Sequence, residues 1–258
     1  MKLKHLLFAA LLLAPGSAVL AQHTQVIAHR GFWDTPGSAQ NSIAALVKAD
    51  SIGCYGSEFD VWLTSDGQLV VNHDETFRGV TFQDATAREC TAIRLDNGEQ
   101  VPTLRQYLEK AQELKTRLIL ELKSHRTPEQ ETRAVEGIVK MVKELGLEHR
   151  TEYISFSRHA VREFIRLAPQ GTPVYYLGGD VSPRELKAWG CAGPDYHFSV
   201  FKQHPEWIEE SHAAGMKVNA WTVNEEEDMR RLIGQGVDFI TTNAPVQLQY
   251  VLQEHRAE

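Results

Sequence analysis

Seven side chains able to do chemistry stand at or near the ends of short apolar runs in the first half of the chain. They are His29, Arg30, Glu58, Asp60, His73, Glu121 and Lys123. Carboxylate oxygens are hard ligands that suit Mg²⁺ or Ca²⁺, and the cysteines and histidines have no zinc-site spacing. Burying so many charges together costs too much free energy unless a divalent cation compensates. The carboxylates Glu58, Asp60 and Glu121 are therefore the candidate metal ligands.

The other four side chains suit an anion and proton transfer. Arg30 can make a planar, bidentate contact to phosphate, and Lys123 adds a second positive charge. Two histidines on separate strands, His29 and His73, can move protons in opposite directions across a bond that breaks. A metal, phosphate donors and an acid/base pair together predict phosphodiester cleavage.

Short apolar runs must position these side chains, and they alternate with longer amphipathic segments. The predicted strands are 25–28, 58–63, 69–72, 117–122, 152–155, 173–177, 196–200, 217–223 and 237–241. The predicted helices are 42–52, 103–114, 128–145, 158–167, 183–189, 205–214, 225–234 and 245–254. This alternation is typical of a parallel sheet wrapped by helices.

The fold class predicted from this order is α/β, a TIM-type (β/α)8 barrel. An open doubly wound sheet is the alternative, but no Gly-rich phosphate loop follows the first strand. Nine runs are one too many for the barrel. Ser65-Asp66-Gly67 predicts a tight turn that pairs the second and third runs, and 196–200 is the first candidate for a loop. Barrel strands end at the face that holds the active site, so the seven side chains are expected to meet there.

The amino terminus has the pattern of a secretory signal. Lys2, Lys4 and His5 precede an apolar run at 6–13, which Pro15 and Gly16 interrupt, and the run is too short to span a membrane. We expect cleavage near Ala21, a periplasmic or secreted protein, and one catalytic domain over 22–258. A membrane anchor or a first core helix is the alternative.

Charge and cysteine content narrow the partners. Residues 1–21 contain two lysines and no acidic residue, so their removal changes the formal charge from −7 to −9. Such a surface opposes capture of nucleic acid or anionic membranes, and leaves a small-molecule substrate. The three cysteines, Cys54, Cys90 and Cys191, allow at most one internal bridge and are interpreted as small buried side chains. The sequence does not indicate the oligomeric state.

An ordered motif series resembles the glycerophosphodiester phosphodiesterase family, in its bacterial, exported type. The motifs are His29-Arg30-Gly31, Ser57-Glu58-Phe59-Asp60-Val61, Thr64-Ser65-Asp66-Gly67, Val70-Val71-Asn72-His73-Asp74, Glu121-Leu122-Lys123, Ser155-Phe156, Trp221-Thr222-Val223-Asn224 and 237–245. The resemblance implies a TIM-type barrel that hydrolyses glycerophosphodiesters to sn-glycerol 3-phosphate and an alcohol with Mg²⁺ or Ca²⁺. It places the metal on Glu58, Asp60 and Glu121, the acid and base on His29 and His73, and phosphate contacts on Arg30 and Lys123.

The sequence departs from the family pattern at two places. Gln40 replaces the usual glutamate of Pro-Glu-Asn, which makes a carboxylate near the metal a neutral amide. Asn243 replaces the usual aspartate before the last helix, where either residue can act as a cap. Trp33, in an insertion at 32–39, either walls the site or packs over the barrel. Trp221 either walls the glycerol site or is a core aromatic.

Three other functions compete with this interpretation. A related barrel phospholipase acting on lysolipids or sphingolipids would need an apolar rim, for which Phe32 and Trp33 are the obvious candidates. A glycosidase would leave both histidines and both cations without a role. A non-catalytic exported protein that binds a phosphate ligand is the third.

Overall fold

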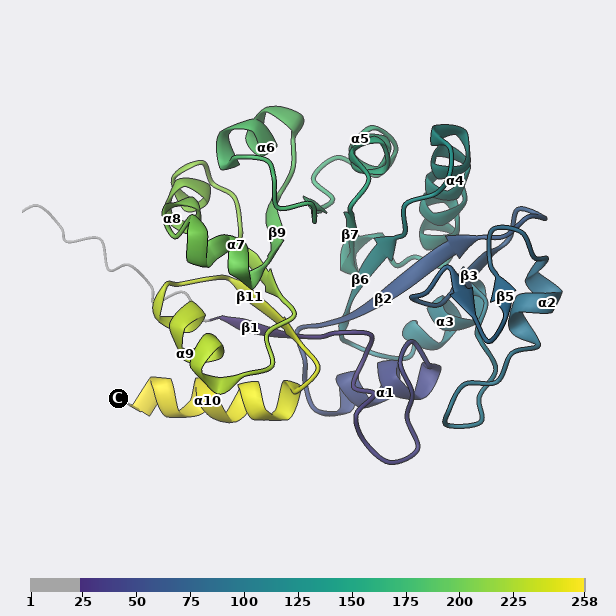
Figure 1. The fold of residues 1–258 in the computed structure, drawn as a ribbon, viewed down its shortest axis with the longest axis horizontal. Helices are drawn as coiled ribbons and strands as arrows, with labels where there is room; N and C mark the ends of the chain where they lie inside the picture. Colours follow the sequence, from purple (N-terminus) through teal and green to yellow (C-terminus); the bar gives the residue numbers. More distant parts are fainter. Residues whose placement is uncertain (1–23, 258) are drawn as a thin grey trace, which may run out of the picture.

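The computed structural model describes residues 24–257, and its centre is a closed barrel of eight parallel strands (Figure 1). In order round the barrel these are β1 (Gln25–Ala28), β2 (Gly56–Leu63), β6 (Arg117–Leu122), β7 (Thr151–Ser155), β8 (Val174–Tyr176), β9 (Gly193–His197), β10 (Asn219–Trp221) and β11 (Phe239–Thr242). Pairing of β1 with both β2 and β11 closes it. The predicted TIM-type barrel is confirmed. The predicted signal peptide at 1–21 lies outside the described residues.

The additional strand among the nine predicted ones, 69–72, is a local antiparallel partner of β2 and not a barrel strand. β3 (Leu69–Val71) pairs antiparallel with it, with Val61 opposite Val71, as the turn at Ser65-Asp66-Gly67 predicts. Setting β3 aside leaves eight runs for eight barrel strands. The expectation that 196–200 forms a loop is therefore wrong. The first two residues of that run end β9, which begins three residues earlier at Gly193. Its last three residues, 198–200, begin the helix α7 (Phe198–Gln203) and are not a strand as predicted.

Helices surround the barrel, and eight of the described ones match the predicted segments. They are α1 (Ile43–Ser51), α3 (Leu104–Ala111), α4 (Pro128–Glu144), α5 (Arg158–Leu167), α6 (Pro183–Trp189), α8 (Glu206–Ala213), α9 (Glu226–Gly234) and α10 (Pro245–Ala257). Capping boxes at Thr103, Thr127 and Ser182 begin three of them, because each hydroxyl satisfies an end N–H that has no helical partner. The sequence did not predict α7 (Phe198–Gln203) or the 3-10 turn Glu148–Arg150.

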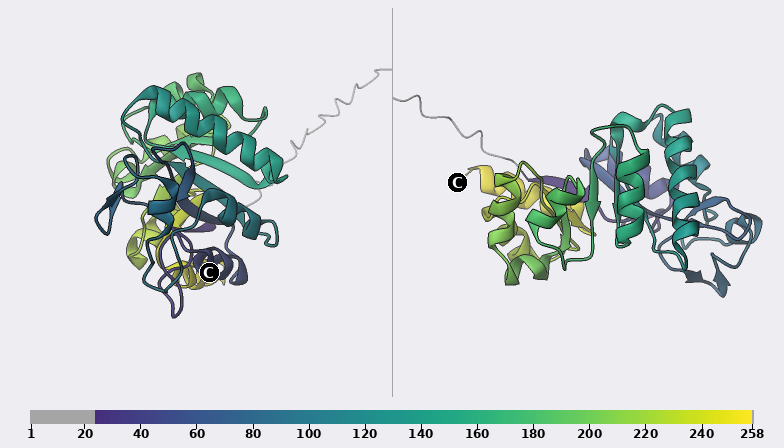
Figure 2. Two further views of the ribbon diagram at one scale, coloured as in Figure 1. Left: turned by 90° about the vertical axis from the view of Figure 1, so that its right-hand side faces the viewer. Right: turned by 90° about the horizontal axis from the view of Figure 1, so that it is seen from above.

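An insertion between β3 and α3 extends the barrel on one side (Figure 2). It holds a two-stranded ribbon, β4 (Thr76–Phe77) with β5 (Val80–Thr81), and the short helix α2 (Ala87–Thr91). The insertion has its own apolar cluster, which includes Phe82, Cys90 and Val101. It was not predicted as a unit, and it forms one wall of the cavity described below.

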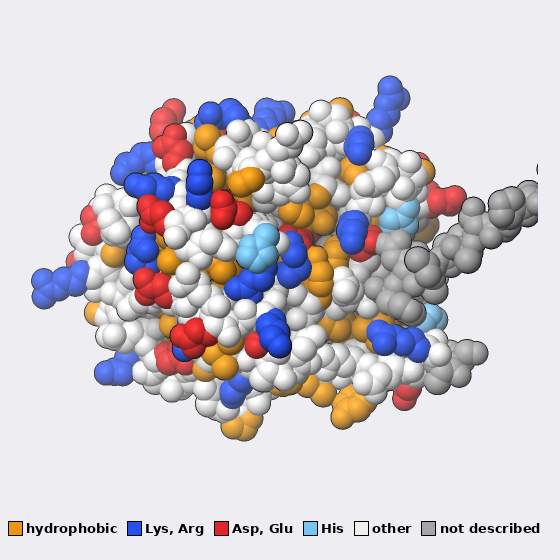
Figure 3. Space-filling model, turned by 180° about the vertical axis from the view of Figure 1, so that it is seen from behind, with side chains coloured by type: hydrophobic (Ala, Val, Ile, Leu, Met, Phe, Trp, Pro, Cys, Tyr) orange, Lys and Arg blue, Asp and Glu red, His pale blue; other side chains and the backbone are white. Residues whose placement is uncertain are grey.

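The barrel has two apolar layers besides this insertion. The larger lies between strands and helices, and a smaller one fills the interior with Ile27, Ile119, Ile154, Tyr175 and Phe239. The three cysteines are buried and unpaired, as interpreted from the sequence. None of the helices in residues 24–257 has the length and apolar character needed to cross a membrane. On the face seen in Figure 3, acidic and basic side chains are interspersed and form no broad field of one sign.

Candidate active site

Three carboxylates from two neighbouring strands converge at the carboxyl end of the barrel. Glu58 and Asp60 are on β2 and Glu121 is on β6, where Asp60 lies opposite Glu121 in the parallel register. One oxygen from each residue lies within 4.8 Å of the others, and the side chains are buried. The structure thus brings together the carboxylates that the sequence proposed as metal ligands.

This cluster has unsatisfied negative charge. Oε1 of Glu58 accepts no hydrogen bond from any described residue, although it is fully enclosed. Burial, and then Asp60 and Glu121, raise the pKa of Glu58 well above its usual range. Burial, and then Asp60, raise the pKa of Glu121 to about 8. A divalent cation would stabilise all three carboxylates in the ionised form, so the residues present fit a metal.

Two cations border the carboxylates. Lys123 Nζ lies 2.8 Å from Glu121 Oε1 and 3.4 Å from Asp60 Oδ1. Burial lowers the pKa of Lys123, but Asp60 and Glu121 more than reverse this, so the ammonium stays charged. Arg30 adopts a left-handed backbone conformation, φ 57°, and its N–H donates to Glu58 Oε2 at 2.7 Å. Its buried Nε forms an ion pair with Asp60 Oδ2 at 3.9 Å, too long for a hydrogen bond, so this N–H has no hydrogen-bond acceptor among the described residues.

His29 is held by a side chain from the opposite end of the sequence. Its Nδ1 lies 2.7 Å from Asn243 Oδ1, and the indole Nε1 of Trp33 lies 3.3 Å from the same atom. An indole N–H only donates, which identifies that atom as the amide oxygen. His29 Nδ1 must then donate its proton, and Nε2 is left to accept one. Burial and Arg30 lower the pKa of His29 to about 4, so the ring is neutral.

His73 has a different partner. Its Nδ1 lies 2.7 Å from a carboxylate oxygen of Asp74, a residue that is largely exposed. A carboxylate stabilises a protonated imidazole, whereas the amide beside His29 does not. Burial lowers the pKa of His73 below its ordinary value, and Asp60 and Asp74, which act in the opposite direction, offset this only in part. Both histidines thus have lowered pKa values, and they differ in that the hydrogen-bond partner of His73 is a carboxylate whereas that of His29 is an amide.

A pocket of about 300 Å³ lies over this cluster. It is lined by both histidines, Arg30 and Lys123 on one side and by an apolar group on the other, namely Ile154, Phe156, Leu177 and Trp221. The Trp221 ring meets Phe156 edge to face at 5.5 Å, and its indole N–H donates to the Asp195 carbonyl. Trp221 thus lines the pocket and also packs against the apolar interior of the barrel, so both of its interpretations stay open. The pocket offers charged donors for one end of a small ligand and an apolar wall for its carbon atoms.

Comparison with known proteins agrees with this geometry. The sequence model of the Glycerophosphoryl diester phosphodiesterase family matches residues 29–247. The chain belongs to this family. A glycerophosphodiester phosphodiesterase of Caldanaerobacter subterraneus is 33% identical over 86% of this chain and 95% of its own length.

Two solved structures extend the family relationship. The crystal structure of a glycerophosphodiester phosphodiesterase from Parabacteroides distasonis superposes with a TM-score of 0.90 at 50% identity, over 92% of this chain and 99% of that one. An Oleispira antarctica phosphodiesterase, solved with the product sn-glycerol-3-phosphate, has a TM-score of 0.74 at 27% identity and covers 90% of this chain and 97% of its own. The family resemblance inferred from the motifs is confirmed, and with it the type of enzyme.

Gln40, the departure from the family's Pro-Glu-Asn, does not join the carboxylate cluster. Its Oε1 accepts from Arg30 Nη1 at 2.6 Å. The next residue, Asn41, is the one that contacts a candidate metal ligand: its Nδ2 donates to Asp60 Oδ2 at 2.9 Å and its Oδ1 accepts from the Asp60 N–H at 3.1 Å. Asn41 has φ 60°, a conformation that asparagine tolerates better than most residues. Sequence reasoning passed over Asn41 in favour of its neighbour.

The expectation that Asn243 caps the last helix is wrong. Its side chain reaches His29, while the hydroxyl of Thr242 accepts the hydrogen bond from the Ala244 N–H at the start of α10. Trp33 lines a neighbouring cavity and its indole N–H donates to Asn243 Oδ1, which leaves both interpretations of this residue open. Asn41, Asp74 and Asn243 are thus positioning residues that sequence reasoning missed.

Proposed function

We propose that this enzyme hydrolyses glycerophosphodiesters to sn-glycerol 3-phosphate and an alcohol, with a divalent cation and acid/base catalysis by two histidines. The observation that supports it best is the arrangement of the three buried carboxylates beside Arg30 and Lys123, with the histidines in the same pocket. The complex of the Oleispira relative with sn-glycerol-3-phosphate supports the product named here.

Glu58, Asp60 and Glu121 would hold the cation, either Mg²⁺ or Ca²⁺. The cation supplies Lewis-acid polarisation of the phosphate and neutralises charge that develops at phosphorus. The unpartnered Glu58 oxygen and the raised pKa values of Glu58 and Glu121 fit this role, since they show that the nearby side-chain cations do not compensate the negative charge of the cluster.

Arg30 and Lys123 would bind the phosphate oxygens. The Arg30 side chain and the charged Lys123 ammonium border the pocket, and both favour the more negative transition state over the monoanionic diester. Trp221 and Phe156 would contact the glycerol carbons. Contacts of that kind are equally strong in the bound substrate and in the transition state, so they lower KM more than they raise kcat.

His29 would be the base and His73 the acid. His29 Nε2 is unprotonated because Asn243 fixes the proton on Nδ1, so it can take the proton of the attacking hydroxyl. That hydroxyl belongs either to water or to the substrate's own glycerol, in which case water opens a cyclic phosphate afterwards. His73, supported by Asp74, would donate a proton to the leaving alkoxide.

An assay of glycerol 3-phosphate release tests the function. The purified protein is stripped with EDTA and given glycerophosphocholine or glycerophosphoglycerol, then Mg²⁺ or Ca²⁺. We expect no release without metal and restored release with it. Metal-independent turnover, cleavage of intact lysolipid or sphingomyelin alone, or binding without release would reject the proposal.

We also propose that the protein is exported, with residues 1–21 removed. The basis is the sequence pattern of that segment. The amino-terminal sequence of the protein recovered from the periplasmic or culture fraction should begin near Gln22. An intact amino terminus in the cytoplasmic fraction would contradict export.

A further inference from the structure

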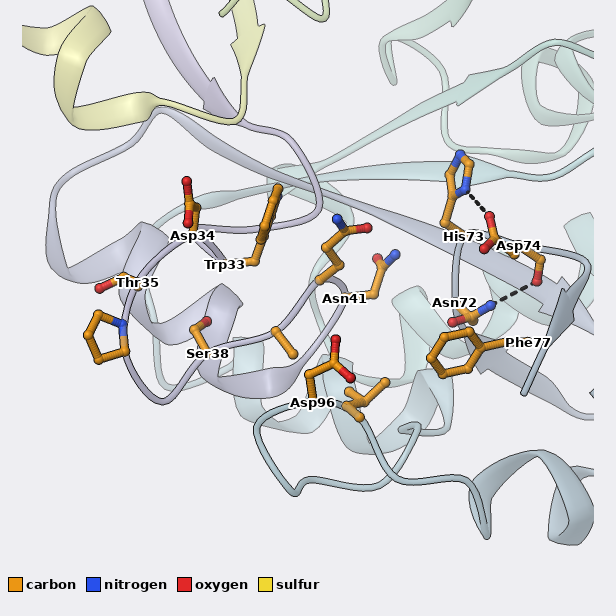
Figure 4. Close-up of a pocket in the computed structure, with 14 residues that line it drawn as sticks. Trp33, Asp34, Thr35, Ser38, Asn41, Asn72, His73, Asp74, Phe77 and Asp96 are labelled. Atoms are coloured by element: carbon orange, nitrogen blue, oxygen red, sulfur yellow. Dashed lines mark hydrogen bonds and ion pairs between the residues drawn. The ribbon is translucent and has the colours of Figure 1, made fainter.

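A second cavity, of about 560 Å³, lies between the β1–α1 loop and the insertion after β3 (Figure 4). Residues 33–36 and 38–41 line one side, and 72–74 with Phe77, Leu95 and Asp96 line the other. His73 lines both this cavity and the inner pocket, whereas His29 lines the inner pocket and not this cavity. The two spaces therefore meet at His73.

The lining of this cavity combines aromatic rings with carboxylates. Trp33 and Phe77 supply the rings, Asp34, Asp74 and Asp96 supply the carboxylates, and no lysine or arginine is among the described lining residues. In Figure 4 the Asp96 carboxylate points toward the space between Asn41 and Phe77. Asp96 is paired with Arg78 and Asp74 with His73, so Asp34 is the lining carboxylate that carries an uncompensated charge. The inner pocket differs in that Arg30 and Lys123 line it together with its carboxylates.

Cations close to the cavity have other partners. Arg78 pairs with Asp96 at 2.5 Å and Lys48 donates to the Pro36 carbonyl. The Arg78 guanidinium also lies 5.3 Å from the centre of the Phe77 ring, so this ring already interacts with a cation. Asp34 has no partner among the described residues, and its charge is available to a ligand.

The positions of the proposed acid and base determine which part of the substrate lies beside this cavity. This step rests on the proposed function. The phosphorus–oxygen bond to the alcohol breaks, and that oxygen takes the proton of His73. The new bond forms on the attacking hydroxyl oxygen, whose proton goes to His29. Because the leaving oxygen is next to His73, the alcohol departs on the side of the second cavity.

We propose that this cavity is the leaving-alcohol subsite and that it selects alcohols bearing an ammonium group. A quaternary or primary ammonium is attracted both by aromatic faces and by carboxylates, whereas a neutral polyol offers the carboxylates hydrogen bonds but no charge, and an acidic headgroup is repelled. Each such contact at a partly exposed site changes affinity by a few fold. Together they give roughly a tenfold preference.

The substrate test compares kcat/KM for glycerophosphocholine with kcat/KM for glycerophosphoglycerol. We expect the wild type to favour the choline diester about tenfold, with most of the preference in KM, and the preference to fall in 0.5 M NaCl as exposed charges are screened. A ratio near one, or a ratio unaffected by salt and by the variants below, would overturn the inference.

Matched variants locate the preference. The double variant Asp34→Asn/Asp96→Asn should lower the ratio roughly five- to tenfold, and Phe77→Leu, which keeps apolar contact, should lower it a few fold. The control is Glu210→Gln/Glu227→Gln, which removes two exposed carboxylates on α8 and α9. An equal fall of the ratio in the control would show an effect of net charge and not of this cavity.

Binding of the alcohol alone separates this inference from the proposed function. Choline and its uncharged isostere 3,3-dimethylbutan-1-ol are titrated against the protein by saturation-transfer NMR. We expect choline to bind about tenfold more tightly, and Asp34→Asn/Asp96→Asn to remove the difference. If neither diester is hydrolysed, the function fails, and equal binding of the two alcohols would still contradict the subsite.

Discussion

Both ends of the barrel bury carboxylates, but the two ends differ in whether those carboxylates have hydrogen-bond partners. At the amino end, Glu152 accepts hydrogen bonds from the Tyr55 hydroxyl and from Arg117 Nε, both at 2.6 Å. At the carboxyl end, Glu58 has an oxygen with no donor, and Glu121 and Asp60 share the ammonium of Lys123. A partnered buried carboxylate contributes to stability, whereas an unpartnered one lowers stability and is expected to bind a ligand.

Removing a carboxylate at the carboxyl end should give the largest effect on activity. Glu58→Gln and Glu121→Gln are each expected to lower kcat/KM at least about a thousandfold, because the cation is lost or displaced. Their thermal unfolding in EDTA should be unchanged or occur at higher temperature, since each substitution removes a buried carboxyl whose ionised form is destabilised, as the raised pKa values indicate. Full activity, or a large loss of stability in EDTA, would make this cluster structural, like the amino end.

Removing either pocket histidine should give the second-largest loss of activity. His29→Ala and His73→Ala are each expected to lower kcat roughly 100- to 10,000-fold while the protein stays folded. His255→Ala, on the exposed last turn of α10, is the control and should be near wild type. Near-normal kinetics in either pocket variant would remove the assigned role.

Substitutions of Asn243 test whether the neutral hydrogen-bond partner of His29 contributes to catalysis. Asn243→Ala should lower kcat roughly 10- to 100-fold, as losses of orienting partners do. Asn243→Asp keeps the acceptor, so it should retain most activity. Its carboxylate favours the imidazolium and raises the pKa of His29, so the acidic limb of the pH profile should move to higher pH. A profile that does not move would show that Asn243 only packs there.

The matching change at the amino end should affect stability and little else. Glu152→Gln removes the charge that Arg117 and Tyr55 contact, and it is expected to lower the free energy of unfolding by about 1–3 kcal/mol. Activity of the folded fraction should stay near wild type. Urea unfolding together with kcat/KM at low temperature checks this, and a selective loss of activity would show that both ends act in catalysis.

The parts of the fold predicted from sequence were those with a clear local period. Strand runs, capping residues and the turn at Ser65-Asp66-Gly67 all depend on neighbours in the sequence. The suspected loop at 196–200 was wrong because β9 begins with Gly193-Pro194, residues that seldom begin a strand prediction. Gly193 fits there because an added Cβ would lie 1.8 Å from the Lys217 carbonyl oxygen, a contact that only the three-dimensional structure reveals.

The candidate site also has residues that the sequence predicts and residues that it does not. Its seven charged and titratable residues could be found because barrel strand ends share one face. Their partners could not be found, since Asn243 and His29 are 214 residues apart and the Asn41 contact depends on a left-handed backbone. The second cavity could not be predicted from the sequence either, because a loop and an insertion line it, and neither shows a periodic pattern of apolar residues.

Metal binding to EDTA-treated protein, measured by calorimetry, tests the central claim most directly. Wild type, Glu121→Gln and Glu152→Gln form the comparison, since the latter two make the same chemical change at opposite ends of the barrel. We expect one Mg²⁺ or Ca²⁺ site in wild type and in Glu152→Gln, and weak or no binding in Glu121→Gln. Equal binding by all three proteins, or no binding by wild type, would contradict the claim that Glu58, Asp60 and Glu121 form a metal site.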